Sequence, residues 1–332
     1  MQRRSFLKNA VVLGSSAYFG SSALAWPGTM PVSATGKKIG IIGLDTSHSE
    51  AFTRVLNTAA ADSIYNGYRV TAAYPYGSRT IASSYNRIPG YIEKVKSHDV
   101  AICSSIDELL KQVDCVLLET NDGHLHPQQA ALVFETHKPV FIDKPVGANL
   151  KEVAQVYEAA AKHGSSFFTS SALRYTSAIT KIKEDAAFGK VLGASTFSPC
   201  TIEPTHEDLY WYGIHGVEML FAVMGPGCKT VQASHAADAD VATGIWDDGR
   251  IGTFRGMGSG VNAFGGQVFG EKRNVVLSDY EGYDGLLKAI IRYFETGEVP
   301  VPAQETKEIY AFMSAFQKSK RLRGKMVPLQ RF

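Results

Sequence analysis

The sequence predicts an α/β fold: a Rossmann doubly wound parallel sheet, followed by an α+β domain with an open, mainly antiparallel sheet. Strand and helix patterns alternate from Lys38 to about residue 170, which is typical of a parallel sheet with helices on both faces. From residue 171 onward, strand-like segments with glycine-rich turns predominate. The chain has 332 residues, 45% of them hydrophobic, which is enough for two cores.

The first half is expected to contain six strands joined by helices. Short apolar runs indicate the strands, and longer stretches with one apolar face indicate the helices. The expected strands are 38–43, 69–74, 100–103, 114–120, 139–143 and 167–169. The expected helices are 49–60, 106–112, 127–136 and 150–163.

The second half is expected to be a sheet backed by helices. The expected strands are 191–198, 228–235, 239–246, 250–257, 264–270 and 273–278. The expected helices are 177–187, 209–224, 284–296 and 305–320.

Composition excludes several classes of protein. A formal charge of +2 offers no basic field for nucleic acid. The four cysteines stand far apart without a CxxC pair, so neither a disulfide scaffold nor a zinc site is expected. They are interpreted as small buried apolar residues. These cysteines are Cys103, Cys115, Cys200 and Cys228.

Residues 1–25 are expected to be an export signal. Arg3-Arg4, an apolar middle and a small-x-small end resemble a bacterial twin-arginine signal, which is an address and no anchor. A basic amphipathic tail is the alternative. The expected organisation is then a leader over 26–36 and two domains, over 37–170 and 171–332. A periplasmic protein without a membrane span is expected.

The turn after the first strand is a modified dinucleotide turn. In the glycine pattern of such turns, Gly43, Asp45 and His48 occupy the three glycine positions. Only Gly43 is a glycine, so the motif by itself is weak evidence for NAD. The second strand ends without the acid that binds a ribose hydroxyl. Ser78 and Arg79 follow it and favour the 2′-phosphate of NADP, although Arg79 as a solvated loop charge remains the alternative.

Three further segments carry a family resemblance. They are Asp143-Lys144-Pro145, His124-Leu125-His126 and the GKVLG run at 189–193. In their order and spacing, residues 37–330 resemble the glucose–fructose oxidoreductase, inositol dehydrogenase and rhizopine-catabolism (Gfo/Idh/MocA) family. The resemblance implies that 37–170 is an NAD(P)-binding domain and that 171–332 is a substrate and oligomerisation domain. It also implies a bound NAD or NADP, oxidation or reduction of a carbinol of a sugar or cyclitol, and a homodimer or homotetramer.

The resemblance implies that Lys144 and His215 are the catalytic pair. Lys144 takes the place of the family lysine that touches the nicotinamide ribose and the reacting hydroxyl, and its ammonium would stabilise an alkoxide. His215 takes the place of the family histidine, a base for the hydroxyl proton. Trp211 stands where the family has an aspartate. Glu218 or Asp208 are the candidates to replace that carboxylate, and Lys144 is expected to take more of the acid–base work.

The substrate is expected to contact the segment around His215. Trp211 and Tyr212, with Tyr210, form an aromatic platform for a sugar ring, with core packing as the alternative for two of them. His206 and its neighbouring acids suit hydroxyl groups. Arg174 is either a clamp for a substrate oxygen or the partner of an acid, and the sequence does not separate the two.

The first and fourth strands are neighbours in a doubly wound sheet, so the loops that follow them meet. Asn121 and His126 are therefore assigned to the nucleotide site. The same cluster holds imidazoles and carboxylates that could bind a metal, but the resemblance places nucleotide and substrate there, and no metal is expected. The members of the cluster are Asp45, His48, Asn121, Asp122, His124 and His126.

Three functions follow, in order of preference. The first is an exported NAD(P)-dependent oxidoreductase with a tightly held cofactor, because a nucleotide cannot be exchanged outside the cytoplasm. The second is a redox-neutral glycoside hydrolase or lyase that passes through a 3-keto intermediate. The third is an inactive sugar-binding scaffold.

Overall fold

The computed structural model describes residues 37–277, 280–330 and 332. The predicted export signal and leader (1–36) lie outside these residues. Within the described part of the chain, no helix is both long enough and apolar enough to cross a membrane.

The first domain is built on a six-stranded sheet in the order β3-β2-β1-β4-β5-β6, and all of its neighbouring pairs are parallel. This is the Rossmann strand order, with the switch point between β1 and β4. The structure thus confirms the predicted parallel sheet. The strands are β1 (Lys38–Ile42), β2 (Arg69–Tyr74), β3 (Ala101–Ile102), β4 (Cys115–Leu118), β5 (Val140–Ile142) and β6 (Phe167–Phe168).

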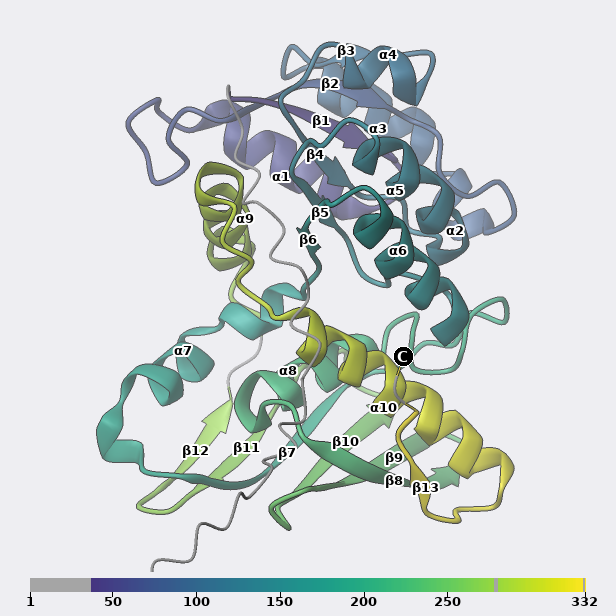
Figure 1. Cartoon of the computed structure of the whole chain (residues 1–332), viewed down its shortest axis with the longest axis vertical. Helices are drawn as coiled ribbons and strands as arrows, with labels where there is room; N and C mark the ends of the chain where they lie inside the picture. The colour runs from purple at the N-terminus through teal and green to yellow at the C-terminus, as the bar shows by residue number, and fades with distance from the viewer. Residues whose placement is uncertain (1–36, 278–279, 331) are drawn as a thin grey trace, which may run out of the picture.

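Helices cover both faces of this sheet (Figure 1). The core on one face includes side chains of α1 and α3, and the core on the other includes side chains of α4, α5 and α6. The helices are α1 (Ser47–Thr58), α2 (Ala82–Tyr85), α3 (Ile88–Lys96), α4 (Ile106–Leu110), α5 (His126–Phe134) and α6 (Leu150–Lys162).

The second domain contains a seven-stranded sheet in the order β12-β11-β7-β10-β9-β8-β13. Only β7 and β10 pair in parallel, and the other neighbours are antiparallel. The predicted fold class is therefore confirmed for both domains. The strands are β7 (Val191–Pro199), β8 (Cys228–Ala236), β9 (Ala239–Trp246), β10 (Ile251–Met257), β11 (Gly265–Gly270), β12 (Asn274–Leu277) and β13 (Val327–Pro328).

Two helices join this second sheet to the first domain. Helices α8 (Ile214–Met224) and α10 (Ala303–Arg321) contribute apolar side chains to the same core as β7–β10. From α10, the Tyr310 hydroxyl accepts a hydrogen bond of 2.8 Å from the backbone N–H of Val146, in the loop after β5. Ahead of them come two short elements, η2 (Ala172–Tyr175) and α7 (Ser177–Glu184).

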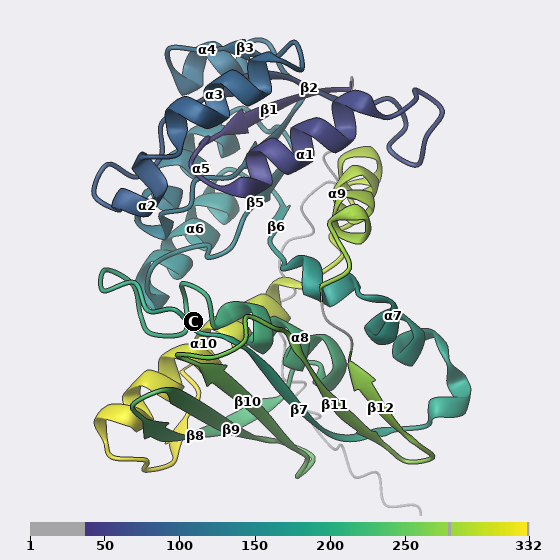
Figure 2. The same ribbon diagram turned by 180° about the vertical axis from the view of Figure 1, so that it is seen from behind.

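Helix α9 (Asp284–Thr296) packs on the first domain, although the sequence boundary at 170/171 assigns it to the second. In both views it lies beside the Rossmann sheet near α1, away from α10 (Figures 1 and 2). Leu286, Ile290 and Phe294 belong to the same buried cluster as Phe52 and Leu56 of α1. The chain therefore returns to the first domain before it ends.

Apart from short 3₁₀ helices such as η2, the elements that were not expected from the sequence are α2, α3 and β13. Helix α3 could not be predicted from the sequence, because it contains Pro89 and Gly90 and both residue types disfavour a helix interior. Pro89 is tolerated because it lies in the first turn, where a missing N–H costs nothing. The predicted helix 209–224 begins only at Ile214. All four cysteines are buried and free, as expected.

Candidate active site

A cavity of about 510 Å³ lies where the carboxyl ends of the Rossmann strands face α8. This is the edge at which doubly wound folds bind ligands. Polar groups of the first domain meet aromatic side chains of the second across it. The lining includes Thr46, Ser47, His48, Asn121, Lys144, Trp211, Tyr212, His215, Phe264, Tyr280 and Tyr283.

Lys144 follows β5 and lines this cavity, with 8% of the residue exposed. The peptide bond between Lys144 and Pro145 is cis. Within the described residues no carboxylate forms an ion pair with the Lys144 ammonium. A buried and unpaired cation is costly, so this ammonium is well placed for an anionic ligand or a developing alkoxide.

His215 lies in the first turn of α8 and lines the same cavity. Its Nδ1 is 2.7 Å from the Ser171 hydroxyl. Burial, together with the charges of Lys144 and His48, holds the pKa of His215 well below its ordinary value. The structure thus brings Lys144 and His215 to one cavity, with His215 neutral.

Neither candidate carboxylate bonds to His215. Glu218 accepts a hydrogen bond of 2.7 Å from Arg174, and Asp208 accepts one of 2.8 Å from Lys320. Tyr212 precedes α8, so it does not share a helical face with His215, although the two rings meet edge to face at 5.1 Å. The prediction that Glu218 or Asp208 replaces the missing aspartate is wrong.

His48 lies next to Asp143 at the floor of the cavity. Its Nδ1 is 2.6 Å from Asp143 Oδ2. Burial opposes ionisation of Asp143, but His48 and Lys144 outweigh it and lower the pKa of this carboxyl. His48, which the sequence assigned to the cofactor, therefore has the charged partner that His215 lacks.

Asp45 connects the loops that follow β2 and β4. Its carboxylate accepts hydrogen bonds from the backbone N–H groups of Ser78 (2.9 Å) and Asn121 (3.0 Å). Burial raises the pKa of Asp45 to about 6, against the opposing effect of these two bonds. The Ser78 hydroxyl donates to Asp122 at 2.8 Å. Ser78 is therefore engaged, and only Arg79 of the predicted 2′-phosphate pair lines a cavity.

The pH dependence of stability is expected to report on Asp45. Its folded pKa of about 6 lies above its ordinary value of 3.8, so the unfolded chain ionises first. Ionisation then destabilises the folded state by about 3 kcal/mol as pH rises from about 4 to 6. The Asp45→Asn variant lacks this ionisable group. In urea unfolding, its free energy of unfolding relative to wild type should therefore rise by about 3 kcal/mol between acid and neutral pH. For the exposed Asp62→Asn variant, the plot of unfolding free energy against pH should run parallel to that of wild type.

Gly43 is required by the tight turn that places these groups. Its φ is +94°, and a Cβ there would lie 2.6 Å from backbone atoms of Thr120. We expect Gly43→Ala to lower the free energy of unfolding by about 2–4 kcal/mol, through strain and overlap with the backbone of the loop after β4. The matched control is Gly90→Ala in α3, where a Cβ meets no atom within 4 Å. That change should leave stability unchanged or raise it by about 0.5–1 kcal/mol.

Two of the predicted nucleotide contacts have structural partners. His126 is fully buried, and its Nε2 is 2.7 Å from the carbonyl of Thr120. It does not line the cavity, so it holds the loop after β4 in place instead of meeting a ligand. Asn121 does line the cavity, and its side-chain amide donates to the Ser84 hydroxyl at 2.8 Å.

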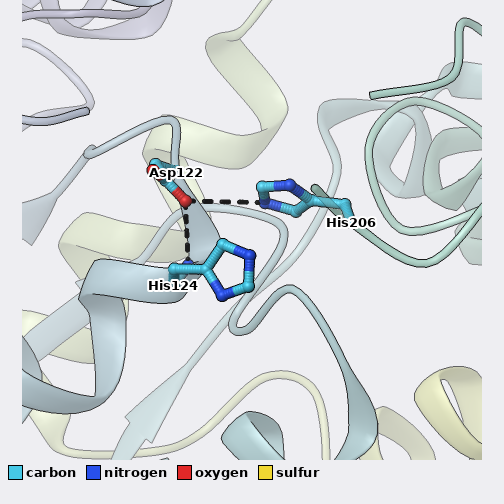
Figure 3. A group of neighbouring side chains, drawn as sticks. All are labelled: Asp122, His124 and His206. Carbon is cyan, nitrogen blue, oxygen red and sulfur yellow. Dashed lines mark hydrogen bonds and ion pairs between the residues drawn. The ribbon is translucent and has the colours of Figure 1, made fainter. Parts of the chain in front are cut away.

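Asp122, His124 and His206 form a group beside the cavity (Figure 3). The ring nitrogens of His124 lie 2.8 Å from a Glu152 oxygen and from the Thr205 carbonyl. His206 Nε2 accepts from the N–H of Gly123 at 3.2 Å. All these ring nitrogens are engaged, so hydrogen bonds account for the group without a metal.

This group fixes the segment that carries Trp211. Burial lowers the pKa of His206 to about 4, and its neutral ring packs edge to face on Trp211 at 5.0 Å. Burial opposes a charge on His124, but its bonds to Glu152 and Thr205 raise its pKa. His206 therefore lies behind the cavity wall and supports Trp211, in place of the predicted substrate contact.

Arg174 is the partner of acidic side chains, which is the second of its two predicted roles. It is buried, and it pairs with Glu218 of α8 and Glu305 of α10. It does not line the cavity. Of the predicted aromatic platform, Trp211 and Tyr212 line the cavity, whereas Tyr210 is in the core with its hydroxyl donating to the Tyr310 carbonyl at 3.0 Å.

Several residues that line the cavity or lie beneath it escaped the sequence analysis. Tyr280 and Tyr283 come from the segment before α9, and no motif marks them. Glu119 is fully buried directly after β4, and an acid at the end of an apolar strand was an available signal. Burial and the nearby charge of Asp143 raise the pKa of Glu119 well above its ordinary value.

The residues fit a nicotinamide dinucleotide in an altered form of the usual site. The N-terminus of α1, with Thr46 and Ser47, opens into the cavity and suits a phosphate group. A second cavity of about 330 Å³, lined by Tyr76 and Arg79, lies at the end of β2, where the adenosine half lies in this fold. Asp45 is buried and lines neither cavity.

Comparisons with known proteins agree with this architecture. Residues 37–171 match the Gfo/Idh/MocA family model, described as an oxidoreductase family with an NAD-binding Rossmann fold. A comparison with curated proteins finds no significant match.

Solved structures match over nearly the whole chain. Scyllo-inositol dehydrogenase from Lactobacillus casei with NAD(H) and scyllo-inositol has 14% identity and a TM-score of 0.69, covering 90% of this chain and 99% of that chain. The WlbA dehydrogenase from Bordetella pertussis with NADH and UDP-GlcNAcA has 18% identity and a TM-score of 0.68, covering 89% of this chain and 99% of that chain. Myo-inositol 2-dehydrogenase from Lactobacillus plantarum has 15% identity and a TM-score of 0.68, covering 88% of this chain and 99% of that chain. These likenesses establish the fold.

Proposed function

We propose that this chain, whose first domain matches the Gfo/Idh/MocA family model, is an NAD(P)-dependent oxidoreductase acting on a CH–OH group of a sugar, glycoside or cyclitol. One observation carries the proposal. In the cavity at the carboxyl edge of the Rossmann sheet, a lysine that forms no ion pair among the described residues meets the His215 imidazole and aromatic side chains of the second domain. The inositol and sugar-nucleotide substrates of the structural neighbours support the substrate class.

Each side chain has a role in this proposal. A bound nicotinamide nucleotide would supply the hydride acceptor. Lys144 stabilises the negative charge that develops on the substrate oxygen. His215, kept neutral, holds that oxygen through a hydrogen bond. Trp211 and Tyr212 bind one face of the sugar or cyclitol ring.

Export belongs to the proposal, and it constrains the cofactor. A periplasmic enzyme meets no free nucleotide pool, so the nucleotide would be loaded before export and held through turnover. A second carbonyl substrate would then reoxidise it in place. Arg79, at the second cavity, favours NADP over NAD by its charge.

The test begins with protein purified without added nucleotide. Heat denaturation should release NAD or NADP, identified by mass spectrometry of the supernatant. Inositols, hexoses and their glycosides should then change the nicotinamide fluorescence of the intact protein. A supernatant without nucleotide, together with no binding of added NAD or NADP, would refute the proposal and favour an inactive scaffold.

Aryl glycosides distinguish the redox-neutral alternative. Release of the aglycone without added nucleotide would indicate hydrolysis or elimination through a 3-keto intermediate. Interconversion of alcohol and ketone without aglycone release supports the oxidoreductase.

A further inference from the structure

Three ionisable groups converge beneath the cavity from three different segments. His48 begins α1, Glu119 follows β4, and Asp143 follows β5. Each offers a ligand atom within 4.8 Å of the other two. All three are buried, and only His48 lines the cavity. The group therefore presents one imidazole to a ligand and keeps two carboxyl groups behind it.

The imidazole of His48 is held in one orientation. Its Nδ1 lies 2.6 Å from Asp143 Oδ2. The ring stacks on Phe52 at 5.3 Å and meets Tyr283 edge to face at 4.9 Å. An ionised Asp143 accepts the Nδ1 hydrogen, which leaves the lone pair on Nε2. This is the arrangement of a base oriented by a third group.

Asp143 is itself held in its ionised form. Its other oxygen, Oδ1, accepts a hydrogen bond of 2.8 Å from the backbone N–H of Lys144. Glu119 has no hydrogen-bond donor to either carboxyl oxygen among the described residues. A protonated Glu119 can donate to the neighbouring Asp143 carboxylate. Of the two carboxyl groups, Asp143 therefore carries the charge.

We propose that His48, oriented by Asp143, is the general base of the reaction, and that Glu119 is a positioning residue behind them. The inference rests on the proposed function. A bound nicotinamide would accept the C–H hydrogen of the substrate carbinol as hydride, and the O–H proton would pass to His48 Nε2. The carbonyl double bond forms, and the new imidazolium is stabilised by the Asp143 carboxylate.

This assignment explains the altered residues of both halves of the site. His48 stands in a glycine position of the dinucleotide turn, and Trp211 stands where an aspartate would orient His215. His215 bonds to a neutral hydroxyl and is buried near the Lys144 ammonium, so it is a weak base. The imidazole–carboxylate pair of this site therefore involves His48 at the start of α1 and not His215 on α8.

The surroundings of His48 suit an imidazole that takes up a proton during the reaction. Asp143 Oδ2 lies 2.6 Å from Nδ1, and a Glu119 oxygen lies 3.9 Å from the same nitrogen. Loss of the Asp143 charge would make the imidazolium less stable and so weaken the base. Tyr283 meets the ring edge to face, and Lys144 and His215 line the same cavity.

The test compares His48→Gln and Asp143→Asn with the wild-type holoenzyme. We expect His48→Gln to lower kcat by about 10²–10⁴-fold with KM changed less than about threefold. Asp143→Asn should lower kcat by about 10–100-fold. In proton NMR spectra of the purified protein, the short Nδ1–H bond should give a downfield resonance that is absent from both variants.

The control is His235→Gln. His235 makes the same 2.6 Å contact with a carboxylate, Asp240, in the second sheet, and its replacement should leave kcat and the downfield resonance unchanged. Turnover by His48→Gln within threefold of wild type overturns the inference and leaves the proposed function intact. Loss of wild-type turnover to a chelator, restored by Zn²⁺ or Mn²⁺, also overturns it and assigns the three groups to a metal. A wild-type protein with neither nucleotide nor polyol turnover refutes the proposed function itself.

Discussion

Replacing Lys144 with methionine is expected to lower kcat/KM by about 10²–10⁴-fold, an effect as large as the one expected for His48→Gln. The ammonium is buried, lines the cavity and has no carboxylate partner among the described residues. It is therefore free to stabilise charge that develops on a substrate oxygen. Steady-state kinetics with the polyol found by the substrate screen measures the effect.

The same substitution should leave the protein as stable as wild type or more stable. Desolvation of an unpaired ammonium opposes folding, and methionine removes that cost while it keeps much of the side-chain volume. A structural role for Lys144 predicts the opposite result in denaturant unfolding. Lys151→Met, at an exposed position on α6, is the control for loss of a lysine. Retention of turnover within threefold in Lys144→Met would contradict the assigned role.

Replacing Arg174 with methionine is expected to lower the free energy of unfolding by about 3–5 kcal/mol. Arg174 Nε donates to Glu218 at 2.7 Å, and another guanidinium nitrogen pairs with Glu305. Arg174 and Glu218 are both almost fully buried. Burial raises the pKa of Glu218, and the charge of Arg174 offsets part of that rise. Removal of the arginine therefore leaves a buried acid without its partner.

Two further variants isolate the cause of this loss. Arg174→Met combined with Glu218→Gln removes the stranded charge and should recover more than half of the lost stability. Arg250→Met removes the 2.7 Å contact with Asp248, where both side chains reach solvent, and should cost less than about 1 kcal/mol. Equal losses in Arg174→Met and Arg250→Met, measured by urea unfolding, would refute the argument from burial.

Local patterns predicted most of the fold. The strand 69–74 and the helix 284–296 have the observed bounds, because apolar periodicity and glycine at a helix end are short-range signals. Helix α3 was missed because Pro89 and Gly90 disfavour a helix by propensity, while the contact of Val95 with the core stabilises it. The packing of α9 on the first domain depends on contacts that no local pattern records.

The site was predicted less completely, and the reason is similar. Lys144 and His215 meet at one cavity, as the family resemblance implied. The pairing of His48 with Asp143 joins residues 95 positions apart, and residue type alone did not reveal it. Arg174 had two chemically equivalent roles in sequence, and only the positions of Glu218 and Glu305 distinguish them. His126 and His206 were assigned to ligands, but the fold uses them to hold its loops.

Helix α9 also bears on how such a protein can diversify. By order in the chain it belongs to the second half, but its side chains pack in the core of the first half. The core of the first half is therefore completed by residues of the second. A recombination event that exchanged whole halves between related genes would separate α9 from the surface that it fits. New substrate preferences are therefore more accessible through point changes in segments such as 200–213, which border the cavity without sharing that interior.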